Sequence, residues 1–198
     1  MSVTVTDTNF GTGCSGTYSV AYTPSSAPES MEITVNTDAF SDQYSVTATP
    51  VGGTGVDDGD PSTPMFMYSI DGGPFQPTGE FSGLEPGEHE VVVMDVNGCG
   101  QVSQSFGLID YPNFFTPNGD GHNDTWNIIG IEGQPSAKIY IFDRFGKLLK
   151  QLSPTGPGWD GTYNGAPMPS TDYWFRIEYT EPRDGTAREF KANFSLKR

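Results

Sequence analysis

Residues 171–180 read TDYWFRIEYT, and the alternation of side chains in this stretch determines the expected fold. Apolar residues recur at every second position, which is the period of a β-strand with one buried face. The residues on that face are Tyr173, Phe175, Ile177 and Tyr179. We therefore predict a strand that packs an aromatic face against a core.

The segments on either side of this strand show the same pattern. Residues 138–152, KIYIFDRFGKLLKQL, predict two strands joined by a turn at Arg144, Phe145 and Gly146. Residues 188–198, REFKANFSLKR, predict a last strand with Lys197 and Arg198 exposed at its tip. Phe190, Ala192, Phe194 and Leu196 share one face of that strand.

The first part of the chain consists of short alternating stretches separated by turn residues. Examples are MEITVN at 31–36, QYSVTATP at 43–50 and HEVVVMDV at 89–96. The chain holds 25 Gly and 16 Pro, which favours many tight turns, and nothing long has the period of an amphipathic helix. We predict an all-β protein made of two tandem immunoglobulin-like β-sandwich domains.

Charge divides the chain sharply. Residues 1–107 contain 14 acidic and no basic side chains, whereas residues 108–198 contain 11 acidic and 10 basic ones. The expected domains are therefore 1–107 and 108–198. A purely acidic module repels phosphate backbones, which argues against nucleic acid as a partner. The acidity is typical of a soluble surface protein, and cation binding is the alternative.

Cys14 and Cys99 are the only cysteines, and their spacing matches neither a zinc nor a redox motif. A disulfide is the simplest interpretation, and it would indicate an oxidising compartment; two unpaired thiols are the alternative. No apolar run has the ~20 residues of a membrane-spanning helix, and the N-terminus lacks a signal-peptide pattern. We expect the chain to be the tail of a longer exported protein.

One loop has the alternating oxygen ligands of a calcium site: Asn118, Asp120, His122 and Asp124. The EF-hand pattern requires Gly where Asn123 stands and a later bidentate Glu, so a loop of self-bonded Asx turns is the favoured alternative. A second calcium candidate is the acidic loop that contains Asp57, Asp58 and Asp60.

Catalytic motifs are not found in the sequence. His89 lies in an expected strand and His122 in the Asn-Gly-Asp loop, and there is no GxSxG, HExxH or glycine-rich phosphate loop. We expect a protein without enzymatic activity.

Residues 68–99 carry the first of two family resemblances. The segments concerned are Tyr68 to Gly73, the turn from Phe81 to Leu84, Pro86-Gly87, and Asp95 to Cys99. They resemble the SprB-type repeat, an immunoglobulin-like unit of large gliding-motility adhesins in Bacteroidetes. The resemblance implies that residues 1–107 form a stalk or adhesive repeat on the cell surface.

The second resemblance covers nearly all of residues 108–198. Its motifs are YPNFFTPNGDGHNDTW at 111–126, IYIFDRFGK at 139–147, GWDGTYNG at 158–165, PSTDYWF at 169–175 and FKANFSLKR at 190–198. In this order they resemble the gliding-motility-associated C-terminal domain, the type B sorting signal of the type IX secretion system.

This resemblance implies a mechanism and a location. The folded C-terminal module would dock on the outer-membrane translocon, with a PorP/SprF-like outer-membrane protein as partner and without inserting into the membrane itself. The protein would pass through the periplasm to the cell surface, and we expect this part of it to be monomeric. The residues expected to contact the translocon are Arg144, Lys147, Phe194, Ser195, Leu196, Lys197 and Arg198. The rival hypothesis is a calcium-assisted carbohydrate- or surface-binding module.

Overall fold

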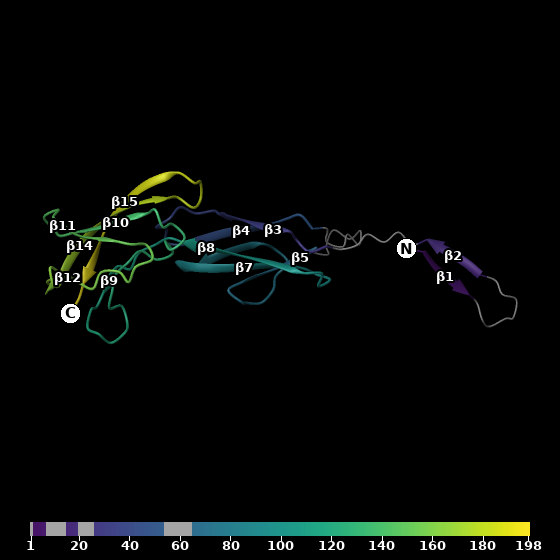
Figure 1. Cartoon of the computed structure of the whole chain (residues 1–198), viewed down its shortest axis with the longest axis horizontal. Coiled ribbons are helices and arrows are strands. Elements are labelled where there is room, and N and C mark those ends of the chain that lie inside the picture. The colour runs from purple at the N-terminus through teal and green to yellow at the C-terminus, as the bar shows by residue number, and fades with distance from the viewer. Residues whose placement is uncertain (1, 7–14, 20–25, 54–64) are drawn as a thin grey trace.

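The computed structural model describes residues 2–6, 15–19, 26–53 and 65–198 of the chain. All regular secondary structure in these residues is β-strand, which confirms the predicted all-β class (Figure 1). The described part of the chain has no helix with the length and apolarity needed to cross a bilayer. A short hairpin of β1 (Ser2–Thr6) and β2 (Ser15–Ser19) stands at the N-terminal end.

The first buried cluster lies between two three-stranded antiparallel sheets. One sheet has the order β3-β4-β6 and the other β5-β7-β8. Their bounds are β3 (Ser30–Val35), β4 (Tyr44–Val51), β5 (Phe66–Ile70), β6 (Glu80–Leu84), β7 (Gly87–Asp95) and β8 (Gln101–Leu108). Val46 of β4 and Val91 and Val93 of β7 are fully buried, so both sheets turn one face inward as a sandwich requires. We call residues 26–108 the first unit.

The turn after β5, at Asp71-Gly72, has a left-handed backbone. Asp71 has φ 51° and Gly72 has φ 70°, and the Gly73 N–H closes the turn on the Ile70 carbonyl at 2.8 Å. Two successive positive φ values are typical of a type I′ turn, for which Asp-Gly is a favoured sequence.

The second buried cluster lies on one face of a five-stranded sheet with the order β11-β10-β14-β15-β9. The bounds are β9 (Phe114–Phe115), β10 (Lys138–Phe142), β11 (Leu148–Leu152), β14 (Thr171–Thr180) and β15 (Ala187–Leu196). The predicted hairpin at 138–152 and the two long final strands are confirmed. The pairing of β15 with β9 is parallel and short, and the sequence pattern did not predict it. We call residues 109–198 the second unit.

The layer opposite this sheet is built mostly from irregular segments. Trp126 and Trp159 form an isolated antiparallel bridge, and both indoles are fully buried. The only regular pieces described in this layer beyond such bridges are β12 (Thr162–Tyr163) and β13 (Ala166–Pro167). Residues 111–126 are rich in Pro, Gly, Asn and Asp, which favour turns over long strands. The aromatic side chains therefore fill the space that a second regular sheet would cover.

Phe194 of β15 is the centre of that aromatic packing. Its ring stacks on the indole of Trp126 with centroids 3.9 Å apart and an interplanar angle of 11°. Four further aromatic rings surround it at 6.0–6.3 Å: Phe115, Trp159, Tyr173 and Phe175. Because Phe194 is only 1% exposed, the last strand is fixed in the core a few residues before the chain ends.

Replacing Phe194 by Ala should lower the free energy of unfolding of the second unit by about 3–5 kcal/mol, because it removes a large buried ring and leaves a cavity. Denaturant unfolding followed by circular dichroism measures this. Leu148→Ala is the matched control, since Leu148 is 48% exposed and should change stability by less than about 0.5 kcal/mol. Equal effects of the two variants would contradict the central position of Phe194.

The two units meet without a spacer. Leu108 belongs to the first buried cluster, and the next residue, Ile109, belongs to the second. The backbones touch here: a Cβ at Gly107 would lie 2.2 Å from the Gly130 carbonyl oxygen, and one at Gly130 (φ 67°) would lie 2.3 Å from the Leu108 oxygen. Only glycine fits such a close approach.

A loop of the first unit, residues 37–43, packs onto the second unit. The Phe40 ring stacks on Phe190 with centroids 4.0 Å apart and meets the Tyr179 ring edge-on at 5.4 Å. The Ala39 N–H donates to the buried carboxylate of Glu181 at 3.1 Å. Arg183 and Arg188 both reach Asp38, at 3.2 and 3.3 Å.

A buried hydroxyl completes this contact. Tyr44 donates to the Ile109 carbonyl at 2.8 Å. Burial, reinforced by the carboxylate of Asp110, raises the pKa of Tyr44 to about 12, so the phenol stays a hydrogen-bond donor over the physiological range. We call this contact between the two units the seam. It combines ring stacking, a cluster of ion pairs and a buried hydrogen bond.

Phe40→Ala should weaken the second unit although Phe40 belongs to the first. All three tryptophans lie in the second unit, so tryptophan fluorescence reports its unfolding alone. Loss of a half-buried ring should lower the free energy of that transition by about 1–2 kcal/mol. The control is Phe75→Ala, which removes a 43% exposed ring of the first unit and should leave the transition in place. An unchanged fluorescence transition for Phe40→Ala would contradict the coupling.

Candidate recognition surface at the distal tip

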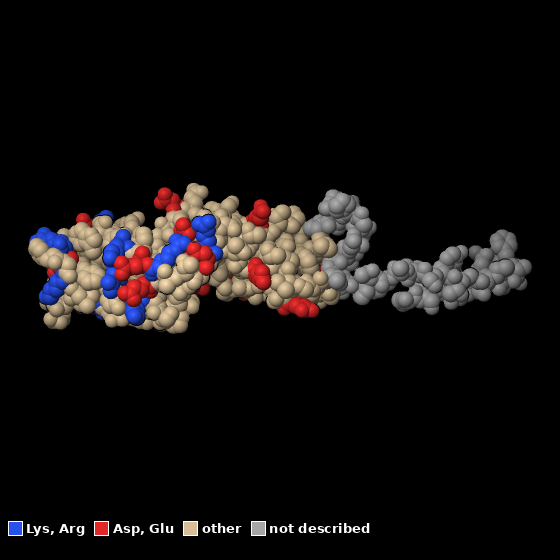
Figure 2. Space-filling model, turned by 90° about the horizontal axis from the view of Figure 1, so that it is seen from above, with Lys and Arg blue, Asp and Glu red and all other residues tan. Residues whose placement is uncertain are grey.

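Basic side chains in the second unit fall into two groups of five. Lys138, Arg176, Arg183, Arg188 and Lys191 form ion pairs with Asp or Glu. Among the described residues, no carboxylate lies within ion-pair distance of the other five, Arg144, Lys147, Lys150, Lys197 and Arg198. Figure 2 shows the basic residues over the second unit, whereas the described part of the first unit shows only acidic ones.

These five cations share one end of the five-stranded sheet. Phe142, where β10 ends, pairs with Trp174 near the start of β14, and Leu196 at the end of β15 pairs with Thr171. The turn after β10 and the chain terminus therefore lie together, at the end away from the first unit (Figure 1). We call this end, residues 143–150, 161–173 and 195–198, the distal tip.

Aromatic rings and carbonyl groups position the cations at the tip. The Lys147 ammonium lies 4.4 Å from the centre of the Tyr163 ring, and that of Lys197 lies 4.1 Å from the Phe114 ring. The Arg144 guanidinium lies 4.9 Å from the Phe145 ring. Arg198 donates to the Met168 and Gly161 carbonyls at 2.8 and 3.2 Å. These contacts orient the cations without neutralising them.

Acidic groups at the tip are engaged in local hydrogen bonds. The Asp143 carboxylate accepts the N–H groups of Phe145 and Lys147, both at 2.9 Å. Asp172 accepts the Ser195 hydroxyl at 2.6 Å. The tip therefore offers free positive charge while its carboxylates stabilise turns and strand ends.

The structure separates the residues expected to contact a translocon into two sets. Arg144, Lys147, Lys197 and Arg198 meet at the tip, whereas the Phe194 and Leu196 side chains are each only 1% exposed and belong to the core. The end of β15 lies between two strands, with the Ser195 N–H bonded to Asn113 and the Lys197 N–H to Phe115. Its backbone is therefore not a free sheet edge.

Exposed apolar side chains also gather at or beside the tip. Phe145 is 82% exposed at the hairpin turn, and Leu148, Phe114 and Trp174 are 48%, 43% and 43% exposed. Leu148, Phe142 and Trp174 pair in one row across three strands, and partners in a row point to the same face. The alternation at 171–180 already puts Trp174 on the polar face of its strand, whereas no sequence pattern indicated that Phe114 and Leu148 are exposed.

A pocket of about 290 Å³ opens at the tip between the turn at 143–145 and the segment 168–171. Phe145, Met168, Pro169 and Tyr173 supply apolar wall, and Arg144 and Asp143 supply charge. Burial raises the pKa of Tyr173, Arg198 and Arg144 oppose that shift, and Asp143 adds to it. The Tyr173 hydroxyl donates to the Pro169 carbonyl at 2.8 Å, which fixes the segment beside the pocket.

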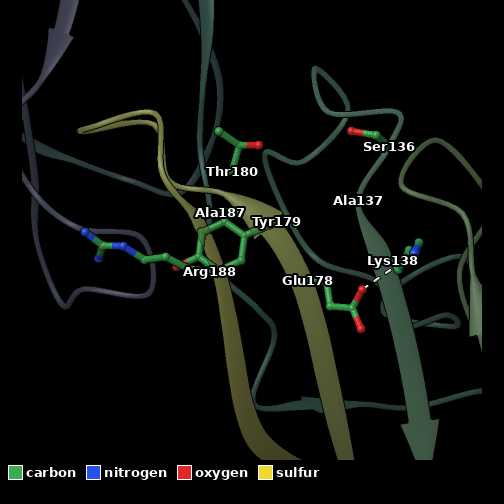
Figure 3. Close-up of a pocket in the computed structure, with 8 residues that line it drawn as sticks. All are labelled: Ser136, Ala137, Lys138, Glu178, Tyr179, Thr180, Ala187 and Arg188. Carbon is green, nitrogen blue, oxygen red and sulfur yellow. Dashed lines mark ion pairs between the residues drawn. The ribbon is translucent and has the colours of Figure 1, made fainter.

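A second pocket, of about 200 Å³, lies beside the seam between the units (Figure 3). Its charges neutralise each other: Lys138 pairs with Glu178 at 3.7 Å, and Arg188 points toward Asp38 and Asp184. The remaining lining residues are Ser136, Ala137, Tyr179, Thr180 and Ala187. This pocket therefore offers a partner less free charge than the tip does.

The candidate calcium loop is held by its own hydrogen bonds. The Asp124 carboxylate accepts the N–H groups of Asn118, Gly119 and Gly121 at 3.0, 2.7 and 2.7 Å. Asn118 and Asp120 each accept the N–H two residues on, as in Asx turns. The alternative of a self-bonded loop thus describes the contacts seen.

The other predicted sites are the calcium ligands and the disulfide. In the residues that the structure describes, no three His, Cys, Asp or Glu side chains converge as metal ligands, so calcium at Asn118, Asp120, His122 and Asp124 stays a prediction. Asp57, Asp58 and Asp60 lie outside the described residues. So does Cys14, while Cys99 is an exposed free thiol, and the predicted disulfide is not seen.

Asp124→Asn should open this loop. Hydrogen bonds from Gly119 and Gly121 hold the pKa of Asp124 below its ordinary value. The carboxylate's contribution to loop order is therefore complete above about pH 4, the unfolded value, and is lost as the pH falls through the lower folded value. The Gly119 and Gly121 amides should lose protection against hydrogen exchange, measured relative to the intrinsic rate at each pH, in the variant at neutral pH and in the native chain in acid. Asp42→Asn, at an exposed site in the first unit, is the control, and unchanged exchange in Asp124→Asn would contradict the assignment.

These features define a small all-β module that fixes its last strand in an aromatic core and presents cations and aromatic rings at one end. Residues 109–194 match the family model of the CHU_C Type IX secretion signal domain. A type IX secretion signal implies export to the cell surface or beyond, and interaction with the type IX secretion machinery. No curated protein matches the chain.

Proposed function

We propose that residues 108–198 are the sorting signal by which the type IX secretion machinery exports a large surface protein without enzymatic activity. The observation that carries this proposal is the family match at residues 109–194, which covers nearly the whole second unit. The aromatic core supports it, because a module that folds around its own last strand can act as a sorting signal independently of its cargo.

The proposal assigns different tasks to the two domains. Residues 1–107 would be an SprB-type stalk or adhesive repeat of a gliding-motility adhesin, exposed at the surface and associated with the outer membrane. The strong acidity of this domain supports a surface role, since negative charge keeps a crowded surface protein soluble. The absence of a spacer at Leu108 and Ile109 would keep repeat and signal in a fixed orientation.

A PorP/SprF-like outer-membrane protein is the proposed partner of the second domain. The distal tip supports this, because free cations and exposed rings at the end opposite the first unit leave the recognition surface clear of the preceding domain. Electrostatic complementarity at such a surface contributes mainly to the rate and orientation of encounter.

Export of a reporter tests the proposal. The whole chain is fused to the C-terminus of a reporter that is exported to the periplasm. The fusion is expressed in a bacterium that has a type IX secretion system. Most of the reporter should reach the cell surface or the medium, because the machinery reads the folded signal. Surface proteolysis and fractionation measure the distribution.

The control is the same fusion in a host that lacks the translocon, where the reporter should stay in the periplasm. A reporter retained in the periplasm of the competent host, with the chain folded and protease-resistant, would contradict the proposed function.

A further inference from the structure

The charges of the distal tip are organised for an acidic partner. Five basic residues have no carboxylate within ion-pair distance among the described residues, and all five lie at or beside this end. Cations elsewhere in the second unit are paired with acids at 2.5–3.7 Å. Ion pairs therefore neutralise the cations of this unit except at the distal tip. The tip is electrostatically complementary to acidic groups of a partner.

The pocket at the tip adds an apolar anchor point. Its volume of about 290 Å³ is of the size that one large side chain fills, and Phe145 stands at its wall with most of its ring in solvent. Interfaces draw most of their affinity from aromatic and Arg groups that meet in such pockets. Arg144 and Phe145, which are adjacent in sequence, both line the pocket and place a cation and an aromatic ring at the same site.

An edge strand borders the same end. β11 pairs with β10 on one side, and no strand of the described residues pairs with its other side. The outward N–H and C=O groups of an edge strand accept an added strand. Lys150 on β11 and Lys147 just before it place cations along this edge.

We propose that the distal tip binds an extended acidic segment of a partner protein, with an apolar side chain of that segment in the pocket beside Phe145. Its carboxylates pair with Arg144 and Lys147, and its backbone follows the β11 edge. This inference rests on the proposed function, and it gives the chemistry by which the export machinery reads the signal.

The charge pattern favours a discrete segment over a membrane surface. Asp143 and Asp172 lie among the cations of the tip, and the whole chain carries a net charge of −15. A uniformly anionic bilayer would face these carboxylates as well as the cations. A peptide segment can place its acids next to Arg144 and Lys147 and keep them away from Asp143.

Peptide binding to the full chain tests the inference directly. The probe is the acetylated, amidated peptide Glu-Glu-Phe-Glu-Glu, and amide chemical shifts of the chain follow its binding. We expect shifts at residues 143–150 and 168–173. The peptides Lys-Lys-Phe-Lys-Lys and Glu-Glu-Ala-Glu-Glu should bind at least about tenfold more weakly, because one lacks the charge and the other the anchor.

Variants of the chain provide the matched comparison. Arg144→Gln and Phe145→Ser should each weaken binding of the acidic peptide about tenfold. Lys138→Gln, which changes an exposed cation away from the tip, should leave this binding unchanged. All three positions are at the surface, and an unchanged unfolding temperature shows that the fold is intact. Peptide binding that is unchanged in the Arg144 and Phe145 variants would overturn the inference. Amide chemical-shift changes confined to the first unit would do the same. So would tighter association with phosphatidylglycerol vesicles than with the peptide, since that outcome indicates a membrane.

Export of the reporter fusion separates this inference from the function on which it rests. If the native fusion is not exported, the proposed function fails, and the peptide result still decides the chemistry of the tip. If the native fusion is exported and the Arg144→Gln, Phe145→Ser double variant is exported equally, the proposed function stands and the inference is overturned. Export of the native fusion and of Lys138→Gln, with loss of export in the double variant, supports both.

Discussion

The stacking of Phe194 on Trp126 is the contact on which the second unit depends. It fixes the last strand three residues before the final pair of cations, so it also fixes where Lys197 and Arg198 emerge. The short parallel pairing with β9 then holds the end of that strand on its other side. The last residues of a domain are ordinarily poorly ordered unless contacts hold them. Here the aromatic core and the added pairing hold residues 194–197 in place.

The seam between the units constrains orientation in the same way. Consecutive residues, Leu108 and Ile109, enter different cores, and glycine backbones touch at Gly107 and Gly130. The loop that carries Phe40 adds stacking on the second unit, together with the buried carboxylate of Glu181. The distal tip consequently lies at the end of the second unit that faces away from the first unit (Figure 1). Cargo that precedes the first unit would not cover the tip.

Much of this architecture could be predicted from residue patterns. The alternation at 171–180 and 188–196 gave the strands and their buried faces correctly, because a period of two specifies a half-buried strand. The Asp71-Gly72 turn also has a sequence that its two positive φ values favour. The β9–β15 pairing could not be predicted, because a two-residue parallel bridge has no local signature. The Phe40 contact was also missed, because it joins segments 150 residues apart and a loop aromatic carries no period.

The candidate site was only partly predictable for related reasons. Arg144, Lys147, Lys197 and Arg198 stood out because cations are rare in this chain, and the sheet order brings them to one end. Phe194 and Leu196 were named with them, yet their side chains face the core. Their place in the alternating pattern already assigned them to the buried face. The pocket beside Phe145 depends on the approach of residues 168–171, which only the tertiary structure reveals.

Site-specific photo-cross-linking in a cell with a type IX secretion system shows whether the distal tip meets the export machinery. A photoreactive phenylalanine analogue replaces Phe145 at the distal tip in one fusion and Phe75 of the first unit in another. We expect a cross-link from position 145 to an outer-membrane component of the export machinery, and none from position 75. Cross-links from position 75 alone, in a fusion that is exported normally, would contradict it.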